Sequence, residues 1–205
     1  KWAISKNFGG VENLISIPGF VGGAPIQNIG AYGVEIKDVF VSCSGYSLNT
    51  IEKKKFKLND CQFSYRSSIF KKSLKNRFII TEVVLQLSKK NHKISKSYNS
   101  IKDAMNKKKI QNPTIKDIAS IVSEIRENKL PNPYLIGNSG SFFKNPIVTI
   151  ELLNKLKKKF SKLVYFKESV SKYKLSAAWL IENCNFKNIE EKNVGVYKNL
   201  SLIHI

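Results

Sequence analysis

The sequence predicts an α+β fold, with strands in its first half and helices in its second half. Residues 36–42 and 78–87 are rich in β-branched residues, which is typical of strands. The second half instead carries apolar residues at helical spacing, preceded by capping residues. With 205 residues and 42% hydrophobic residues, the chain can build one large domain or two small ones around a real core.

The strands come first along the chain. Residues 49–60, between the two β-branched stretches, are polar and rich in lysine, and we interpret them as a hairpin or loop between strands. The last six residues, LSLIHI, have the composition of a further strand. The polar, lysine-rich stretch at about 89–112 is the best candidate for a domain boundary.

Three helices are predicted in the second half. Thr114 can cap the first, with Asp117 three residues later, and the pair Leu130-Pro131 ends it. Ile115, Ile118, Ile121, Val122 and Ile125 give this helix its apolar face. The second helix covers about 149–160, and the third begins near Ser176.

The chain is strongly basic, with 35 Lys and Arg against 15 Asp and Glu and a net charge of +20. A basic domain that binds nucleic acid or another polyanion is therefore one alternative. Arginine, the residue best suited to read bases, occurs only at Arg66, Arg77 and Arg126, and the lysines are spread over the whole chain. This spread favours a general drift in composition, so we predict no nucleic-acid partner. A basic field would still attract an anionic small substrate.

Several other classes of protein are disfavoured. No apolar run reaches the roughly 18 residues that cross a bilayer, and the first ten residues lack the apolar stretch of a signal peptide. Cys43, Cys61 and Cys184 match no zinc or redox spacing, and the two histidines are far apart in sequence. We therefore expect reduced structural thiols in a cytoplasmic protein, and neither a metal site nor a histidine-based catalytic triad.

The strongest functional signal is the segment IPGFVGGAPIQNIGAYG, residues 17–33. Seven of the eleven glycines fall between Gly9 and Gly33. Glycine lets the backbone adopt positive φ and approach a ligand closely, so this segment suits a loop that wraps a cofactor and offers N–H groups to a pyrophosphate. The spacing fits neither the Rossmann fingerprint nor a P-loop. A set of tight turns between short strands is the alternative.

Two further segments carry candidate chemistry. In FSYRSSIFK, residues 63–71, the isolated Arg66 can clamp a carboxylate or stabilise a developing enolate, and a structural salt bridge is the alternative. In GNSGSFFKNP, residues 137–146, Gly137 and Gly140 allow a sharp turn that presents Ser141, followed by Lys144 and Asn145. The pattern is not a nucleophile elbow, so Ser141 suits a proton donor or hydrogen-bonding group. A capping turn before a strand is the alternative.

In order along the chain, four blocks resemble the UDP-N-acetylenolpyruvoylglucosamine reductase (UDP-N-acetylmuramate dehydrogenase) family. They are residues 17–33, 65–71, 129–133 (KLPNP) and 137–146, and a weaker match, KLSAAWLI, covers 174–181. Four blocks in order over nearly the whole chain argue against chance. A related flavin oxidase, which would lack the Ser141 block, is a further alternative.

The resemblance implies both a domain plan and a reaction. Residues 1–90 would be the later part of an FAD-binding domain of the vanillyl-alcohol-oxidase (PCMH) type, and 105–205 most of an α/β substrate-binding domain. NADPH would reduce FAD, and the flavin would pass hydride to the enolpyruvyl double bond of the UDP-sugar, giving a peptidoglycan precursor. The protein would work as a monomer on a small-molecule substrate.

The resemblance also assigns residues. Arg66 matches the cation that stabilises the enolate, and Ser141 matches the proton donor. Tyr98, Lys129 and Asn145 match substrate-binding positions, the first with one residue of offset. The cofactor-binding positions all lie in the glycine-rich segment: Gly19, Gly22, Gly23, Ala24, Pro25, Gln27, Asn28, Gly30, Ala31 and Gly33.

Two departures from the family pattern lead us to expect a chain truncated at both ends. The family's Gly-Gly-Gly-Ser-Asn loop is not present before these blocks, and its catalytic glutamate strand would follow Ile205. A longer natural chain and a decayed gene both fit this pattern. On this basis we expect the 205 residues alone to bind FAD weakly and turn over poorly.

Overall fold

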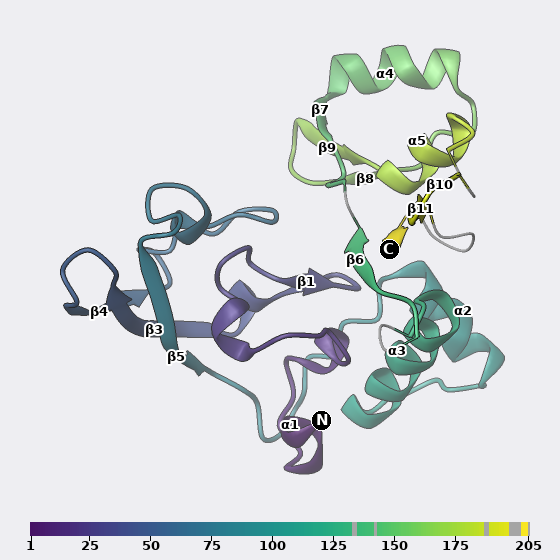
Figure 1. Ribbon diagram of the computed structural model, residues 1–205. Coiled ribbons are helices and arrows are strands. Elements are labelled where there is room, and N and C mark those ends of the chain that lie inside the picture. Colours follow the sequence, from purple (N-terminus) through teal and green to yellow (C-terminus); the bar gives the residue numbers. More distant parts are fainter. Residues whose placement is uncertain (133–134, 142, 187–188, 197–201, 205) are drawn as a thin grey trace. The chain divides into compact units, whose positions relative to one another are not determined.

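The computed structural model describes residues 1–132, 135–141, 143–186, 189–196 and 202–204 (Figure 1). The chain divides into two compact units, residues 1–126 and 127–205, and each is described by itself. This division groups residues by close packing, and the predicted domain boundaries at 90 and 105 stay a prediction.

The first unit is built on a three-stranded antiparallel sheet with the strand order β4-β3-β5. A short ribbon of β1 and β2 precedes the sheet, and two helices follow it (Figure 1). The elements of this unit are α1 Trp2–Ser5, β1 Gly30–Ala31, β2 Val34–Glu35, β3 Phe40–Ser47, β4 Lys53–Lys57, β5 Phe78–Leu85, α2 Asn99–Lys107 and α3 Ile115–Lys129, whose last residues lie in the second unit.

The core of the sheet lies on one face of β3. Cys43 and Phe56 are directly opposite each other on β3 and β4 and contribute to this face. Five fully or nearly buried residues form the cluster, namely Phe40, Cys43, Cys61, Ile69 and Phe70. Phe56 and Phe70 meet edge to face, with 5.3 Å between ring centroids. The core therefore joins the sheet to residues 61–70, the segment that contains Arg66.

The strand predictions are confirmed with one shift. β5 covers residues 78–85 of the strand predicted at 78–87, and β4 forms the hairpin expected within 49–60. The strand predicted at 36–42 begins later, because Ile36–Asp38 forms a turn of 3₁₀ helix and β3 starts only at Phe40. The Asp38 carboxylate accepts a hydrogen bond of 2.8 Å from the Glu35 N–H, a capping box that β-branched composition alone does not reveal.

The first predicted helix is confirmed as α3. The Thr114 hydroxyl accepts from the Asp117 N–H at 3.3 Å, and the Asp117 carboxylate accepts from the Thr114 N–H at 2.7 Å. The apolar face expected on this helix packs against α2. The sequence does not predict α2, since only Ile101, Ala104 and Met105 interrupt the polar stretch at about 89–112.

The second unit contains two small sheets and two helices. One sheet has the order β7-β9-β8 and the other the order β10-β11-β12-β6. The bounds are β6 Asn138–Ser141, β7 Ile147–Thr149, α4 Ile150–Lys159, β8 Tyr165–Lys167, β9 Lys172–Leu175, α5 Ala177–Asn183, β10 Glu190–Glu191, β11 Val194–Val196 and β12 Leu202–His204. The two helices and the terminal strand predicted in this region are confirmed.

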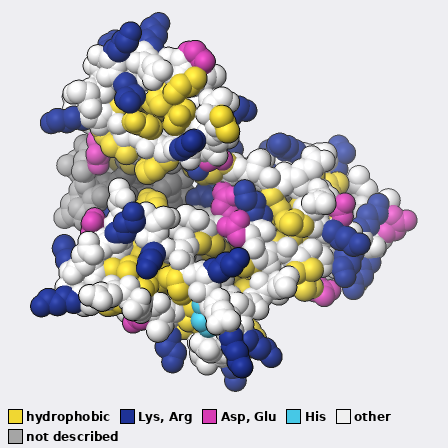
Figure 2. Space-filling model, turned by 180° about the vertical axis from the view of Figure 1, so that it is seen from behind, with side chains coloured by type: hydrophobic (Ala, Val, Ile, Leu, Met, Phe, Trp, Pro, Cys, Tyr) yellow, Lys and Arg dark blue, Asp and Glu magenta, His cyan; other side chains and the backbone are white. Residues whose placement is uncertain are grey.

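The basic residues are scattered, as the sequence suggested. Lys and Arg side chains are spread over the face seen in Figure 2, with fewer Asp and Glu among them. None of the helices in the described ranges has the length and apolar character required to cross a bilayer.

Candidate functional site

The glycines of residues 17–33 fall into two groups by their surroundings. At Gly19, whose φ is +104°, and at Gly23, an added Cβ would meet nothing within 4 Å. At Gly22 the same Cβ would lie 3.0 Å from the Ile80 carbonyl oxygen, and at Gly30 it would lie 2.9 Å from the Val34 carbonyl oxygen. Some glycines thus allow close packing inside the protein, whereas others leave the backbone open to a ligand.

The open part of this segment also exposes apolar side chains. Phe20 is 94% exposed and Val21 is 62% exposed, next to the two open glycines. Backbone that a ligand can approach closely, beside uncovered apolar surface, fits the flat ring system and phosphates of a flavin nucleotide. The residues present therefore fit the predicted cofactor.

Not every predicted cofactor residue faces solvent. Ala24, Pro25 and Asn28 are buried, whereas Gln27 and Gly33 are exposed, and Gly30 and Ala31 are half-buried. The Asn28 side chain bonds entirely within the protein, to Glu35, to Ser64 and to the Lys37 N–H. Contact of these buried positions with a cofactor stays a prediction, and for Asn28 it would have to involve the backbone.

Arg66 lies beside this segment. Its Nη2 donates to the Gly30 carbonyl oxygen at 2.6 Å, and its guanidinium lies 5.3 Å from the centre of the Tyr65 ring. No carboxylate pairs with Arg66 within the described part of the chain, so the salt bridge considered as an alternative is not observed there. The structure thus brings Arg66 to the predicted cofactor segment, with a carbonyl as its partner rather than an acid.

A second cluster in the first unit surrounds Tyr32 and includes the predicted substrate residue Tyr98. The two rings meet edge to face at 5.3 Å. The pKa of Tyr32 is raised, mainly by burial. The Arg126 charge acts in the opposite direction, and Tyr98 adds to the increase. Asn13, which is 1% exposed, donates its amide to the Tyr32 and Ser95 carbonyl oxygens at 3.0 and 3.1 Å.

Some polar atoms of this cluster are buried without a hydrogen-bond partner. They include Asn13 Oδ1 and Arg126 Nε, and Ser100 Oγ, two residues after Tyr98, is in the same condition. Buried polar groups are nearly always paired, so each of these atoms calls for a partner such as an ordered water or a bound polar group. Neither Tyr32 nor Arg126 is among the site residues predicted from the sequence. The rarity of arginine, which drew attention to Arg66, was the signal that could have found Arg126.

The remaining predicted residues belong to the second unit. Ser141 is exposed at the end of β6, and Lys129 is exposed at the end of α3. Asn145 Oδ1 accepts from the Ala177 N–H at 3.0 Å, at the start of α5. The sharp turn expected at 137–140 is wrong, because residues 138–141 pair with β12 as a strand. A role for any of these three residues stays a prediction.

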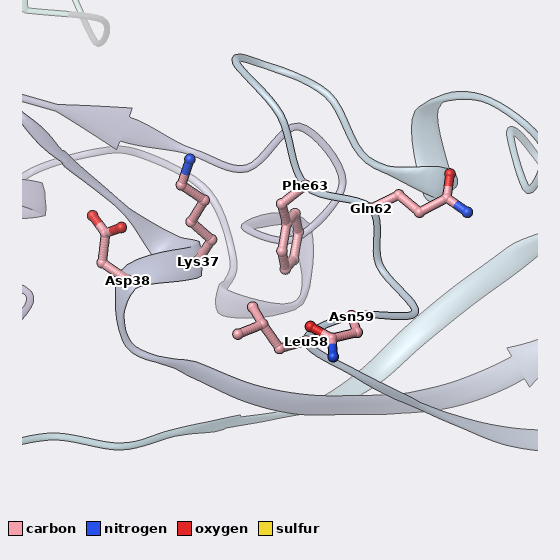
Figure 3. Close-up of a pocket in the computed structure, with 6 residues that line it drawn as sticks. All are labelled: Lys37, Asp38, Leu58, Asn59, Gln62 and Phe63. Carbon is pink, nitrogen blue, oxygen red and sulfur yellow. The ribbon is translucent and has the colours of Figure 1, made fainter. Parts of the chain in front are cut away.

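A hollow of about 410 Å³ lies between residues 37–38 and residues 58–63 (Figure 3). Its lining residues are Lys37, Asp38, Leu58, Asn59, Gln62 and Phe63. Lys37 is paired with Glu35 at 2.8 Å, and the Asp38 carboxylate accepts from the Glu35 N–H. Because its charged groups are already engaged, we do not assign this hollow a ligand.

The thiols behave as two kinds. Cys43 and Cys61 are fully buried in the same core cluster, where the neighbouring Cys43 thiol and burial raise the pKa of Cys61. Cys184 is exposed, and all three are free. Among the described residues, no group of three or more His, Cys, Asp or Glu side chains could hold a metal ion.

Comparisons with known proteins point in one direction. Residues 132–204 match the family model described as UDP-N-acetylenolpyruvoylglucosamine reductase, C-terminal domain. A UDP-N-acetylenolpyruvoylglucosamine reductase from Flavobacterium johnsoniae is 48% identical over 202 residues, which are 98% of this chain and 60% of that protein. One from Pseudomonas fluorescens is 40% identical over 203 residues, 99% of this chain and 59% of that protein. This chain thus spans about 60% of the length of these relatives.

A solved structure agrees at the level of the fold. The UDP-N-acetylenolpyruvylglucosamine reductase of Thermus caldophilus aligns with a TM-score of 0.64 and 18% identity, over 100% of this chain and 56% of that one. At this identity the likeness concerns the fold alone.

Proposed function

Because the chain belongs to the UDP-N-acetylenolpyruvoylglucosamine reductase family, we propose that this protein reduces the enolpyruvyl group of its UDP-sugar to UDP-N-acetylmuramate with NADPH and FAD. The observation that carries the proposal is the contact of Arg66 with Gly30. Gly30 belongs to the glycine-rich segment, residues 17–33, whose backbone is open to a ligand at Gly19 and Gly23. On this proposal the protein is a cytoplasmic monomer that serves peptidoglycan synthesis.

The glycine-rich segment would hold the flavin. Gly19 and Gly23 would admit the cofactor to the backbone, and Phe20 would cover part of its apolar surface. When bound, the FAD would carry the hydride from NADPH to the substrate. The fold of this unit would then be the later part of a flavin domain of the vanillyl-alcohol-oxidase type.

Arg66 would supply the electrostatic stabilisation. Hydride addition to the enolpyruvyl carbon leaves negative charge on the neighbouring carbon and its carboxylate, and a preorganised cation lowers that barrier. Arg66 has no acidic partner in the described part of the chain that would neutralise it. Ser141 would donate the proton that completes the reduction.

The anionic part of the substrate would be bound by polar and basic residues. Tyr98, Lys129 and Asn145 are the predicted contacts. The buried Arg126 Nε without a partner, close enough to Tyr32 to shift its pKa, gives a further donor for an anionic group such as a diphosphate.

Arg66 can be tested against an arginine outside the site. With excess FAD added to the chain, NADPH oxidation should depend on the enolpyruvyl UDP-sugar. Arg66→Lys should lower kcat by about 10² to 10³, the scale expected for the loss of one transition-state donor. Arg77→Lys, which changes an exposed arginine, should leave kcat within about twofold.

Two results would count against the proposal. One is NADPH oxidation that does not depend on the UDP-sugar, or that falls equally in Arg66→Lys and Arg77→Lys. The other is a colourless protein that takes up no FAD and binds DNA with a steep salt dependence, which would favour the polyanion-binding alternative.

A further inference from the structure

The turn that carries Arg66 is closed by its own backbone. Ser64 and Ser67 exchange two N–H to carbonyl bonds of 3.0 Å, and the Ile69 N–H bonds to the Cys61 carbonyl oxygen at 3.0 Å. Arg66 itself has φ +52°, in the left-handed region that a bulky side chain rarely adopts. These local bonds shape the turn but do not fix it against the neighbouring glycine segment.

At residues 64–68 that connection is made by side-chain bonds from Ser68, Asn28 and Arg66, and Lys71 Nζ adds a longer one, to Gln27 Oε1 at 3.4 Å. Ser68 Oγ donates to the Ile26 carbonyl oxygen at 2.6 Å, and Asn28 Nδ2 donates to the Ser64 carbonyl oxygen at 3.2 Å. Between them, Arg66 Nη2 donates to the Gly30 carbonyl oxygen at 2.6 Å. The two connections from Ser68 and Asn28 thus fall two residues after and two residues before Arg66.

Neither Asn28 nor Ser68 is available to a ligand through its side chain. Both are 0% exposed. Asn28 Oδ1 also accepts from the Lys37 N–H at 3.1 Å, and its Nδ2 also donates to Glu35 Oε2 at 2.9 Å. Ser68 Oγ also accepts from the Phe70 N–H at 3.2 Å. Whatever these side chains contribute must therefore act through the segments that they join.

We infer that Asn28 and Ser68 are positioning residues that hold the Arg66 guanidinium at the Gly30 carbonyl. Each fixes one side of the Arg66 turn to the glycine segment by a buried bond, so Arg66 is held in place before any substrate arrives. The positioning stands on these contacts alone, whereas its importance for catalysis rests on the proposed function of Arg66.

The rigidity of Arg66 can be measured directly. The chain has three arginines, so a ¹⁵N-labelled sample gives three Nε–H signals, and Arg66→Lys identifies that of Arg66. In the unmodified protein the ¹H–¹⁵N NOE of Arg66 Nε should approach the backbone value, and that of the exposed Arg77 should be low. This comparison needs no variant in the connecting residues. An Arg66 as mobile as Arg77 would overturn the inference.

Variants then separate the two connections. Ser68→Ala removes the hydroxyl, and Asn28→Ala removes the amide that donates to Ser64 and Glu35 and accepts from the Lys37 N–H. Each should bring the Arg66 NOE toward that of Arg77. Ser67→Ala is the matched control, because no hydrogen bond of its hydroxyl is observed within the described part of the chain. An Arg66 signal that stays rigid in both folded variants would overturn the inference.

Kinetics distinguish this inference from the function on which it rests. In a chain with the proposed activity, Ser68→Ala should lower kcat by about ten- to a hundredfold while KM changes less than about threefold, since misplacement of a catalytic group costs on this scale. If Arg66 becomes mobile in Ser68→Ala while kcat is unchanged, the proposed catalytic role of Arg66 is contradicted, but the inference that Ser68 positions it stands. If Arg66 stays rigid in Ser68→Ala while kcat falls, the inference about positioning is contradicted instead.

Discussion

At Gly30 a single missing side chain lets three parts of the chain meet. A Cβ there would lie 2.9 Å from Glu35 Cγ, 2.9 Å from the Val34 carbonyl oxygen and 3.0 Å from Arg66 Nη1. Two of these neighbours belong to the β1–β2 ribbon, and the third is the proposed catalytic cation. The glycine is therefore required by the protein's own packing, and not only by a ligand.

Gly30→Ala and Gly23→Ala form a matched pair that tests this. Gly30→Ala should lower the free energy of unfolding by about 1–3 kcal/mol, the usual cost of forcing extra volume into a packed site. Gly23→Ala, where a Cβ meets nothing within 4 Å, should change it by less than about 0.5 kcal/mol. Urea unfolding followed by circular dichroism measures both. Equal losses of unfolding free energy in the two variants would mean that the close contacts around Gly30 do not determine the cost of adding a Cβ there.

The helices of the chain show how far local sequence determines an element. Thr114, Thr149 and Ser176 each accept a bond from the N–H three residues ahead, at 3.3, 3.4 and 3.2 Å. All three helices were predictable, because the cap and the apolar periodicity lie in the same short stretch.

The capping box of α3 makes a pH-dependent contribution to stability. Hydrogen bonds from the Thr114 side chain and N–H lower the pKa of Asp117 below its usual value. The unfolded chain therefore takes up the proton first, so this contribution is complete above the unfolded pKa of about 3.9. It is lost as the pH falls through the lower folded pKa.

Thr114→Ala should lower the free energy of unfolding by about 1 kcal/mol at neutral pH, as expected for a lost helix cap. The difference from the unmodified protein should shrink as the pH falls below about 4. Urea midpoints measured across this range give both results, with Ser120→Ala, an exposed residue within the same helix, as the control. A difference that is independent of pH would show that Asp117 is not the partner that matters.

Features that depend on contacts between distant segments could not be predicted from the sequence. The glycine segment and Arg66 could be selected, because each is unusual in composition within a few residues. The contact of Arg66 with Gly30 and the cluster of Tyr32 with Arg126 join residues 36 and 94 positions apart, and nothing local encodes them. The helix α2 was missed for a similar reason, since its two buried residues, Ile101 and Met105, matter only through their packing on α3.

Charge acts over the whole chain. A net charge of +20 is large for 205 residues, and ion pairs such as Lys54–Glu52 and Lys108–Glu124 join largely exposed side chains. Exposed pairs of this kind contribute little each, so they do not offset the repulsion among the lysines. Such repulsion weakens the folded state relative to the more expanded unfolded chain.

Salt should therefore stabilise the protein. Raising NaCl from about 0.01 M to about 0.5 M shortens the screening length from about 30 Å to about 4 Å. The thermal midpoint should rise by several degrees, since a gain of about 1 kcal/mol shifts it by about 2–4 °C in a chain of this size. The rise should depend on ionic strength and be similar for chloride and acetate, whereas a specific anion site would favour one of them. A midpoint that falls or stays constant over this range, measured by circular dichroism, would show that self-repulsion does not limit stability.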